Sequence, residues 1–179
     1  YRWARSIGRY APRAHFVELY MRHEPGEFSA DDYRGVYVLM EKIKRDQHRV
    51  SVEKFTDDDP SEISGGYVLK RDWVEREPIT TERYGDELLF VYPKTDDVSP
   101  AQERFINEYL NGFEDALARE DGSYDEYIDV ESFADHMLMM ELSRNVDAYV
   151  LSTYMHKRRS GVLTMGPIWD FNGSLGNAD

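Results

Sequence analysis

Two stretches near the C-terminal end decide how this sequence is interpreted: Glu141-Leu-Ser-Arg-Asn-Val-Asp147 and Gly166-Pro-Ile-Trp-Asp170-Phe-Asn-Gly173. Asp147 follows a strongly apolar helical pattern, and Asp170 ends a short apolar segment before a glycine-rich tail. Phosphoryl transfer uses two such carboxylates, one to orient the acceptor hydroxyl and one to hold magnesium. The same pattern also fits an aspartate that hydrogen-bonds its own loop at a helix end, so Asp147 has two interpretations from spacing alone.

A β-hairpin is predicted between the two aspartates. Residues 149–155 and 162–165 are rich in β-branched and aromatic residues, and the basic segment 157–161 would form the turn between them. Before this hairpin, apolar residues recur with helical spacing from about Asp129 onward, which predicts a helix that leads into Asp147.

A second helix is predicted to begin directly after Ser99. Ser99 is a favourable N-cap, Pro100 suits the first helical position, and Gln102 can complete a capping box. Apolar residues then recur with helical spacing to about Ala118. The chain therefore changes from mainly β to mainly helical character at this point.

The first part of the sequence is predicted to contain four strands, at residues 16–21, 35–43, 65–70 and 87–92. The acidic segment 57–60 is typical of a solvated loop. We expect an α+β fold in one domain over 1–179, with a β-rich N-terminal lobe (about 1–95), a helical C-terminal lobe (about 96–179) that carries the hairpin, and a cleft between them.

Composition excludes several classes of function. The chain of 179 residues has a net charge of −13, which disfavours a nucleic-acid groove but allows nucleotide binding through local lysines and Mg²⁺. Cysteine is absent, which excludes disulfides and thiol-based sites. No apolar run approaches the roughly 18 residues that span a bilayer. Because the chain starts at Tyr1 without Met, we expect a fragment whose targeting signals are not visible.

Several further side chains are candidates for binding. Asp170 lies among aromatic residues, where a carboxylate needs a partner such as magnesium or arginine. Lys70 ends a predicted strand and either contacts phosphates or is solvated, with Glu41 as a candidate ion-pair partner. Trp169 either stacks on a purine or packs in the core, and Asn172 is either an ancillary metal ligand or a turn former.

Five segments, taken together and in order, resemble the spore-coat CotH kinase family, whose members are atypical, secreted or spore-associated protein kinases. They are Tyr33-Arg-Gly-Val-Tyr-Val-Leu-Met-Glu-Lys-Ile43, Gly65-Gly-Tyr-Val-Leu-Lys-Arg-Asp72, Tyr127-Ile-Asp-Val-Glu-Ser-Phe133, Asn145-Val-Asp147 and Gly166-Pro-Ile-Trp-Asp-Phe171. The resemblance covers nearly the whole chain and implies a degenerate, two-lobed kinase fold without the usual glycine-rich loop.

The resemblance implies a kinase that uses ATP with Mg²⁺ or Mn²⁺ and a Ser/Thr hydroxyl of a protein substrate, such as a coat or surface protein. Asp147 would be the catalytic aspartate and Asp170 the magnesium ligand. Lys70 would contact phosphate. Trp169 and Tyr67 would form the two walls of an adenine site. The expected location is extracellular, at the cell surface or in the spore coat.

The sequence departs from the family pattern at two candidate metal ligands. Ser152 stands where many members have asparagine, and Asn172 stands where many have aspartate. Both changes weaken the second metal site. Two alternatives to an active kinase therefore stay open: a nucleotide-binding pseudokinase, and a cation-stabilised extracellular interaction module without catalysis.

Overall fold

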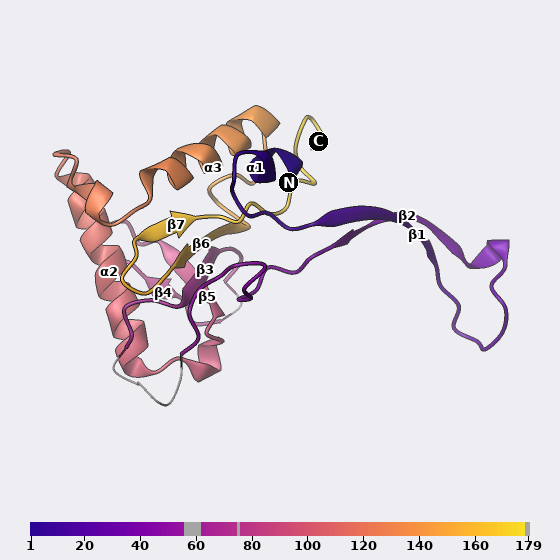
Figure 1. The fold of residues 1–179 in the computed structure, drawn as a ribbon, viewed down its shortest axis with the longest axis horizontal. Helices are drawn as coiled ribbons and strands as arrows, with labels where there is room; N and C mark the ends of the chain where they lie inside the picture. Colours follow the sequence, from indigo (N-terminus) through magenta and orange to yellow (C-terminus); the bar gives the residue numbers. More distant parts are fainter. Residues whose placement is uncertain (56–61, 75, 178–179) are drawn as a thin grey trace.

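A computed structural model describes residues 1–55, 62–74 and 76–177 and shows an α+β fold (Figure 1). The helices are α1 (Arg2–Ser6), α2 (Pro100–Ala118) and α3 (Val130–Ser143), with short 3₁₀ helices η1 (Ala30–Asp32), η2 (Thr95–Asp97) and η3 (Ser123–Glu126). The strands are β1 (Ala14–Tyr20), β2 (Tyr33–Met40), β3 (Tyr67–Arg71), β4 (Ile79–Thr80), β5 (Glu87–Tyr92), β6 (Thr153–Lys157) and β7 (Leu163–Met165). Among these residues, no helix combines the length and apolar character needed to cross a bilayer. The acidic segment 57–60 lies outside the described residues.

A five-stranded antiparallel sheet in the order β4-β5-β3-β6-β7 forms the centre of the molecule. Its strands come from both sides of the boundary predicted near residue 95, because β3 pairs with β5 on one edge and with β6 on the other. The sheet therefore joins the two predicted lobes, and the structure does not confirm a division between them. The short strand β4 and helix α1 were not predicted.

Helix α2 covers one face of this sheet. The predicted cap is confirmed, since the Ser99 side chain accepts the N–H of Gln102 and the Gln102 side chain accepts the N–H of Ser99. Ile106 and Leu110 of the helix pack against a buried cluster that includes Leu69 of β3 and Leu88 of β5. Burial of this apolar surface provides the main stabilisation of the sheet–helix layer.

The opposite face of the sheet packs against the segment 43–52. Val68 points to this side because successive side chains of a strand alternate between its two faces. It forms a second buried cluster with Ile43, Val50 and Val52 of the segment and with Tyr154 of β6. Side chains on the two faces of β3 therefore pack in different layers. The candidate site described below lies on the face toward the segment 43–52.

The N-terminal segment is held against α3. Arg9 makes ion pairs with Asp129, the N-cap of α3, at 3.1 Å and with Asp135 at 2.6 Å. A third buried cluster joins Ala4 and Ala11 to Met140 of α3 and to Ile168. This packing brings the start of the chain close to the segment that carries Asp170 (Figure 1).

Strands β1 and β2 form a separate two-stranded arm that projects from the rest of the molecule (Figure 1). Their antiparallel pairing runs from Ala14 opposite Met40 to Tyr20 opposite Tyr33. The predicted strands at 16–21 and 35–43 are thus confirmed with shifted ends, but they do not belong to the central sheet. Phe16 is 82% exposed, so the arm buries little apolar surface of its own.

The strand predicted at 149–155 begins only at Thr153, so that prediction is wrong for residues 149–152. The N–H groups of Val150 and Leu151 both donate to the backbone carbonyl of Asp147, which closes a tight turn. Tyr149 and Ser152 have φ values of 68° and 50°, in the left-handed region that strands do not use. Asp147 is consequently followed by a compact loop before β6.

Helix α3 carries a buried histidine whose imidazole has no hydrogen-bond partner. His136 is 5% exposed, and neither ring nitrogen bonds to another group in the described chain. Burial lowers the pKa of His136 from 6.5 to about 4, because an imidazolium would lose its hydration there. The folded protein therefore resists protonation of this side chain over a range in which the unfolded chain accepts a proton.

This difference predicts an acid-sensitive fold. As the pH falls from about 6.5 to 4, the unfolded state gains a proton at His136 and the folded state does not, so the free energy of unfolding decreases by up to about 3 kcal/mol. His136→Leu should remove this part of the pH dependence in urea unfolding measured between pH 7 and 4. His15→Leu on the exposed arm is the control and should retain the parent slope. Equal slopes for parent and His136→Leu would contradict the assignment.

Candidate active site

A pocket of about 610 Å³ lies on the face of the sheet that packs against the segment 43–52. Three parts of the chain line it: the segment after β2, strands β3 and β5, and β6 with the residue before Asp170. Its lining residues are Lys42, Ile43, Lys44, Arg45, Lys70, Phe90, Val91, Tyr92, Lys94, Tyr154 and Trp169. We call it the basic pocket.

The charge of this pocket is opposite to that of the protein. The chain carries a net charge of −13, yet all the described charged side chains that line the pocket are lysine or arginine. Aromatic rings of Tyr92, Tyr154 and Trp169 line the same pocket. Such a combination suits a ligand with a flat apolar part and a strongly anionic part, because rings stack on the former and cations neutralise the latter.

Lys70 lies in the basic pocket, as the sequence suggested, but its partner is not Glu41. The Lys70 ammonium of β3 pairs at 2.8 Å with Asp72, which directly follows the end of this strand. Glu41 instead pairs with Arg13 and, at 3.6 Å, with Arg49. The β1–β2 register explains this difference. Ala14 pairs with Met40, so the next residues beyond this pair, Arg13 and Glu41, lie side by side at the base of the arm.

The pairing with Arg13 also lowers the pKa of the Glu41 carboxyl. Hydrogen bonds from the Arg13 side chain and backbone lower the pKa of Glu41 to about 2. Glu41 is therefore a structural anchor of the arm. Asp72, which the sequence placed in a quoted motif without a role, is the residue that orients Lys70.

Tyr67 does not line the basic pocket. It is 0% exposed and lies on the α2 side of the sheet, stacked on Phe105 with ring centroids 6.2 Å apart, and its hydroxyl donates to the carbonyl of Ile63 at 2.7 Å. Strand alternation explains the error, because Tyr67 and Lys70 are separated by an odd number of positions and so face opposite layers. Tyr154 takes the place beside Trp169, with ring centroids 6.4 Å apart in an edge arrangement.

Asp170 directly follows Trp169, a lining residue of this pocket. Burial raises the pKa of Tyr154 to about 12, and the charges of Asp72 and Asp170 add to this rise. Asp170 has a φ of 53°, a left-handed conformation that turns the chain sharply after Trp169. Lys70 and Trp169 thus lie beside Tyr154, with Asp72 paired to Lys70 and Asp170 next in the chain after Trp169.

Asn145 joins the loop of Asp147 to the loop of Asp170. Its side-chain oxygen accepts the backbone N–H of Asp147 at 3.3 Å, and its side-chain nitrogen donates to the carbonyl of Asp170 at 3.0 Å. Asn145 is buried, so its two bonds are shielded from water. The sequence analysis quoted Asn145 in a motif without a role, and the structure shows that it links the two loops.

Both candidate carboxylates are free to bind a ligand. In the described part of the chain, the side chain of neither Asp147 nor Asp170 makes a hydrogen bond or ion pair, and both residues are partly exposed. The alternative that the Asp147 carboxylate caps its own loop is therefore not seen, since the turn uses the Asp147 backbone carbonyl instead. This arrangement leaves two acidic side chains available on adjacent loops.

The other predicted metal ligands are less well supported. Ser152 is half-buried in the left-handed part of its loop, and Asn172 is exposed, with its backbone carbonyl accepting from the Asn177 side chain at 2.6 Å. Over the described residues, no group of three or more His, Asp or Glu side chains could hold a metal ion. Asp170 fits Mg²⁺ nevertheless, because Mg²⁺ at phosphoryl-transfer sites is held by one or two carboxylates together with substrate phosphates and water.

Comparison with known proteins adds one finding. The family model described as CotH kinase protein matches residues 1–179, the whole chain. Comparison with curated proteins gives no match.

Proposed function

This chain belongs to the CotH kinase family, and we propose that it transfers the γ-phosphoryl group of ATP to a Ser/Thr hydroxyl of a protein substrate. The observation that carries this proposal is the basic pocket, which combines cations and aromatic rings and includes Trp169, the residue before Asp170. Because the family is associated with the spore coat, a coat or surface protein is the proposed acceptor.

The basic pocket supplies both parts of an ATP site. The adenine ring would lie against Trp169, which presents the largest aromatic surface of the lining. The triphosphate would be neutralised by Lys70, with Lys42, Lys44 and Lys94 increasing the local positive potential. The ion pair with Asp72 holds Lys70 in the pocket, so this lysine is oriented before the nucleotide arrives.

The two aspartates have separate roles in the proposed reaction. Asp170 would hold Mg²⁺, which when bound neutralises charge on the phosphate oxygens. Asp147 would accept a hydrogen bond from the acceptor hydroxyl and take its proton as the oxygen attacks the γ-phosphorus, while the bond from that phosphorus to the β–γ bridging oxygen breaks and ADP leaves. Asn145 keeps the two loops in a fixed relation, and this pre-organisation lowers the cost of aligning the reacting groups.

Nucleotide binding is tested by thermal or urea unfolding with ATP and Mg²⁺. At a free concentration about 100 times the dissociation constant, the nucleotide should stabilise the parent protein by about 2.7 kcal/mol. Asp170→Ala should lose the Mg²⁺-dependent part of this stabilisation, because it removes the carboxylate that would hold the ion. Asp125→Ala, at an exposed carboxylate of η3, is the matched control and should retain the full effect. Absence of stabilisation by any nucleotide would refute the proposal.

A pseudokinase is the second candidate function. Ser152 replaces the stronger carboxamide ligand, and the exposed Asn172 replaces a carboxylate, so binding without turnover is the outcome these residues favour. Stabilisation by Mg²⁺ and ATP together with no transfer of labelled phosphate would identify this function. The interaction module without catalysis stays an alternative, and stabilisation by Ca²⁺ with no effect of ATP would identify it.

A further inference from the structure

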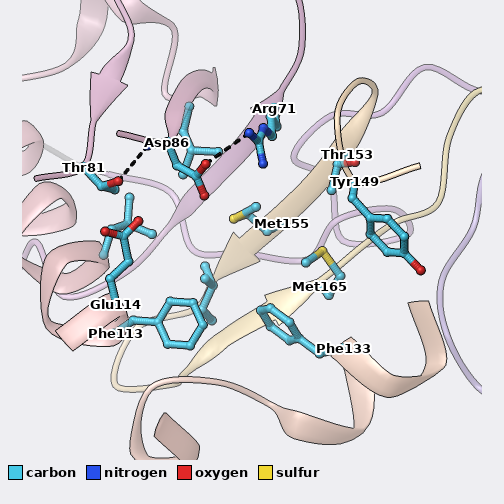
Figure 2. A pocket seen from close by; sticks show the side chains of 13 residues that line it. Arg71, Thr81, Asp86, Phe113, Glu114, Phe133, Tyr149, Thr153, Met155 and Met165 are labelled. Carbon is cyan, nitrogen blue, oxygen red and sulfur yellow. Dashed lines mark hydrogen bonds and ion pairs between the residues drawn. The ribbon is translucent and has the colours of Figure 1, made fainter. Parts of the chain in front are cut away.

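A second pocket, of about 200 Å³, lies on the α2 side of the sheet, and the proposed phosphoryl transfer does not use it (Figure 2). Phe113 of α2, Phe133 of α3 and Tyr149 of the loop before β6 contribute aromatic rings. Met155 and Met165, which are paired across β6 and β7, complete the apolar lining. We call this the aromatic pocket.

Four polar side chains of the aromatic pocket, those of Arg71, Thr81, Asp86 and Glu114, lie on the side away from Phe133 (Figure 2). Arg71 and Asp86 form an ion pair at 3.1 Å, so their charges largely cancel. Thr81 accepts the backbone N–H of Asp86 at 2.9 Å. One lining carboxylate, that of Glu114, then remains to be neutralised.

Glu114 is buried and makes no ion pair within the described residues. It is 5% exposed, and one carboxylate oxygen accepts the N–H of Tyr84 at 3.2 Å, while the other makes no hydrogen bond within the described residues. The neighbouring Arg83 is engaged with Asp115 at 2.7 Å. A carboxylate on a largely buried side chain is favoured by a nearby cation, and the second oxygen of Glu114 has no donor among the described residues, so it offers a position for a positively charged group.

We infer that the aromatic pocket binds an organic ammonium ion with a small apolar body. The ammonium group would lie between the free oxygen of Glu114 and the ring faces, since aromatic faces attract cations as carboxylates do. A dry cavity of about 150 Å³ is enough for benzene, so this pocket admits a ring with a short aminoalkyl chain. The net charge of −13 further favours a cation over an anion of the same shape.

The test uses phenethylammonium as the probe, with the neutral isostere 2-phenylethanol and the anion phenylacetate for comparison. Binding is measured by titration calorimetry and by NMR of the methionine methyl groups. Met155 and Met165 should shift on binding, whereas Met21 at the end of the arm should not. Phenethylammonium should bind at least about tenfold more tightly than 2-phenylethanol, as a charge-assisted hydrogen bond requires.

Two variants keep the inference falsifiable. Glu114→Gln retains an acceptor for Tyr84 and should abolish the preference for the ammonium ion, while Glu108→Gln removes the same charge from an exposed position of the same helix and should leave it intact. Phe113→Leu leaves Glu114 in place and should weaken the ammonium probe more than 2-phenylethanol, because only the cation also loses its attraction to the ring face. Equal binding of the three probes, a preference that survives Glu114→Gln, or no shift of Met155 and Met165 would overturn the inference. None of these measurements depends on phosphoryl transfer.

Discussion

Replacement of Asp147 by asparagine is expected to lower phosphoryl transfer by about 10²- to 10⁴-fold, the usual contribution of a positioned general base. Asparagine preserves the size of the side chain and the backbone turn that Val150 and Leu151 close on residue 147, but it cannot take a proton from the acceptor hydroxyl. Nucleotide binding should be unchanged, because the basic pocket is lined by other residues. The measurement is transfer of labelled phosphate from ATP and Mg²⁺ to casein, together with unfolding in the presence of the nucleotide.

The comparison needs a control that changes charge without touching the site. Asp125→Asn, at an exposed position of η3, removes one carboxylate and should retain the parent rate. If Asp147→Asn and Asp125→Asn transfer phosphate equally well, Asp147 is not the catalytic aspartate. A parent protein that binds ATP but transfers no phosphate would instead identify the pseudokinase.

Substitution of Gly65 by alanine is expected to destabilise the fold by more than about 4 kcal/mol, an exceptional effect for one methyl group. A Cβ at Gly65 would lie 2.1 Å from the backbone carbon of Arg158 and 2.2 Å from the backbone nitrogen of Arg159. Both atoms belong to the turn after β6, which cannot yield without separating β3 from β6. Urea unfolding followed by circular dichroism measures the change.

Gly161 provides the matched control, because it contacts the same turn with ordinary spacing. A Cβ there would lie 3.5 Å from Arg158, and neither glycine has a positive φ that alanine would disfavour. Gly161→Ala should therefore change the free energy of unfolding by less than about 1 kcal/mol. Similar stability of the Gly65 and Gly161 variants would show that the β3–β6 junction adapts more readily than these distances indicate.

Elements stabilised by local interactions were predicted well from the sequence. Helix α2 begins and ends where the capping box and the apolar period placed it, and β5 has the predicted bounds. In both cases the determining residues are neighbours in the chain. The loop 149–152 was missed because β-branched and aromatic residues there favour a strand, while hydrogen bonds to the Asp147 carbonyl impose left-handed turns instead.

The candidate site was predicted in part. Lys70 and Trp169 do line one pocket, and Asp170 directly follows Trp169. The partner of Lys70 and the second aromatic wall could not be predicted, because each depends on which layer a strand face contacts. The same holds for Asn145, whose two hydrogen bonds join positions on different loops.

The sequence by itself determined the order of the longer helices and strands, the family, and the two aspartates on which the proposed chemistry depends, since these follow from local patterns and from motifs along the chain. Only the tertiary structure decided that β1 and β2 leave the central sheet as an arm, that Glu41 anchors that arm, and that Tyr154 rather than Tyr67 lies beside Trp169. The physical reason is strand pairing. Register and alternation assign each side chain to one face of the sheet, and that assignment depends on residues distant in sequence.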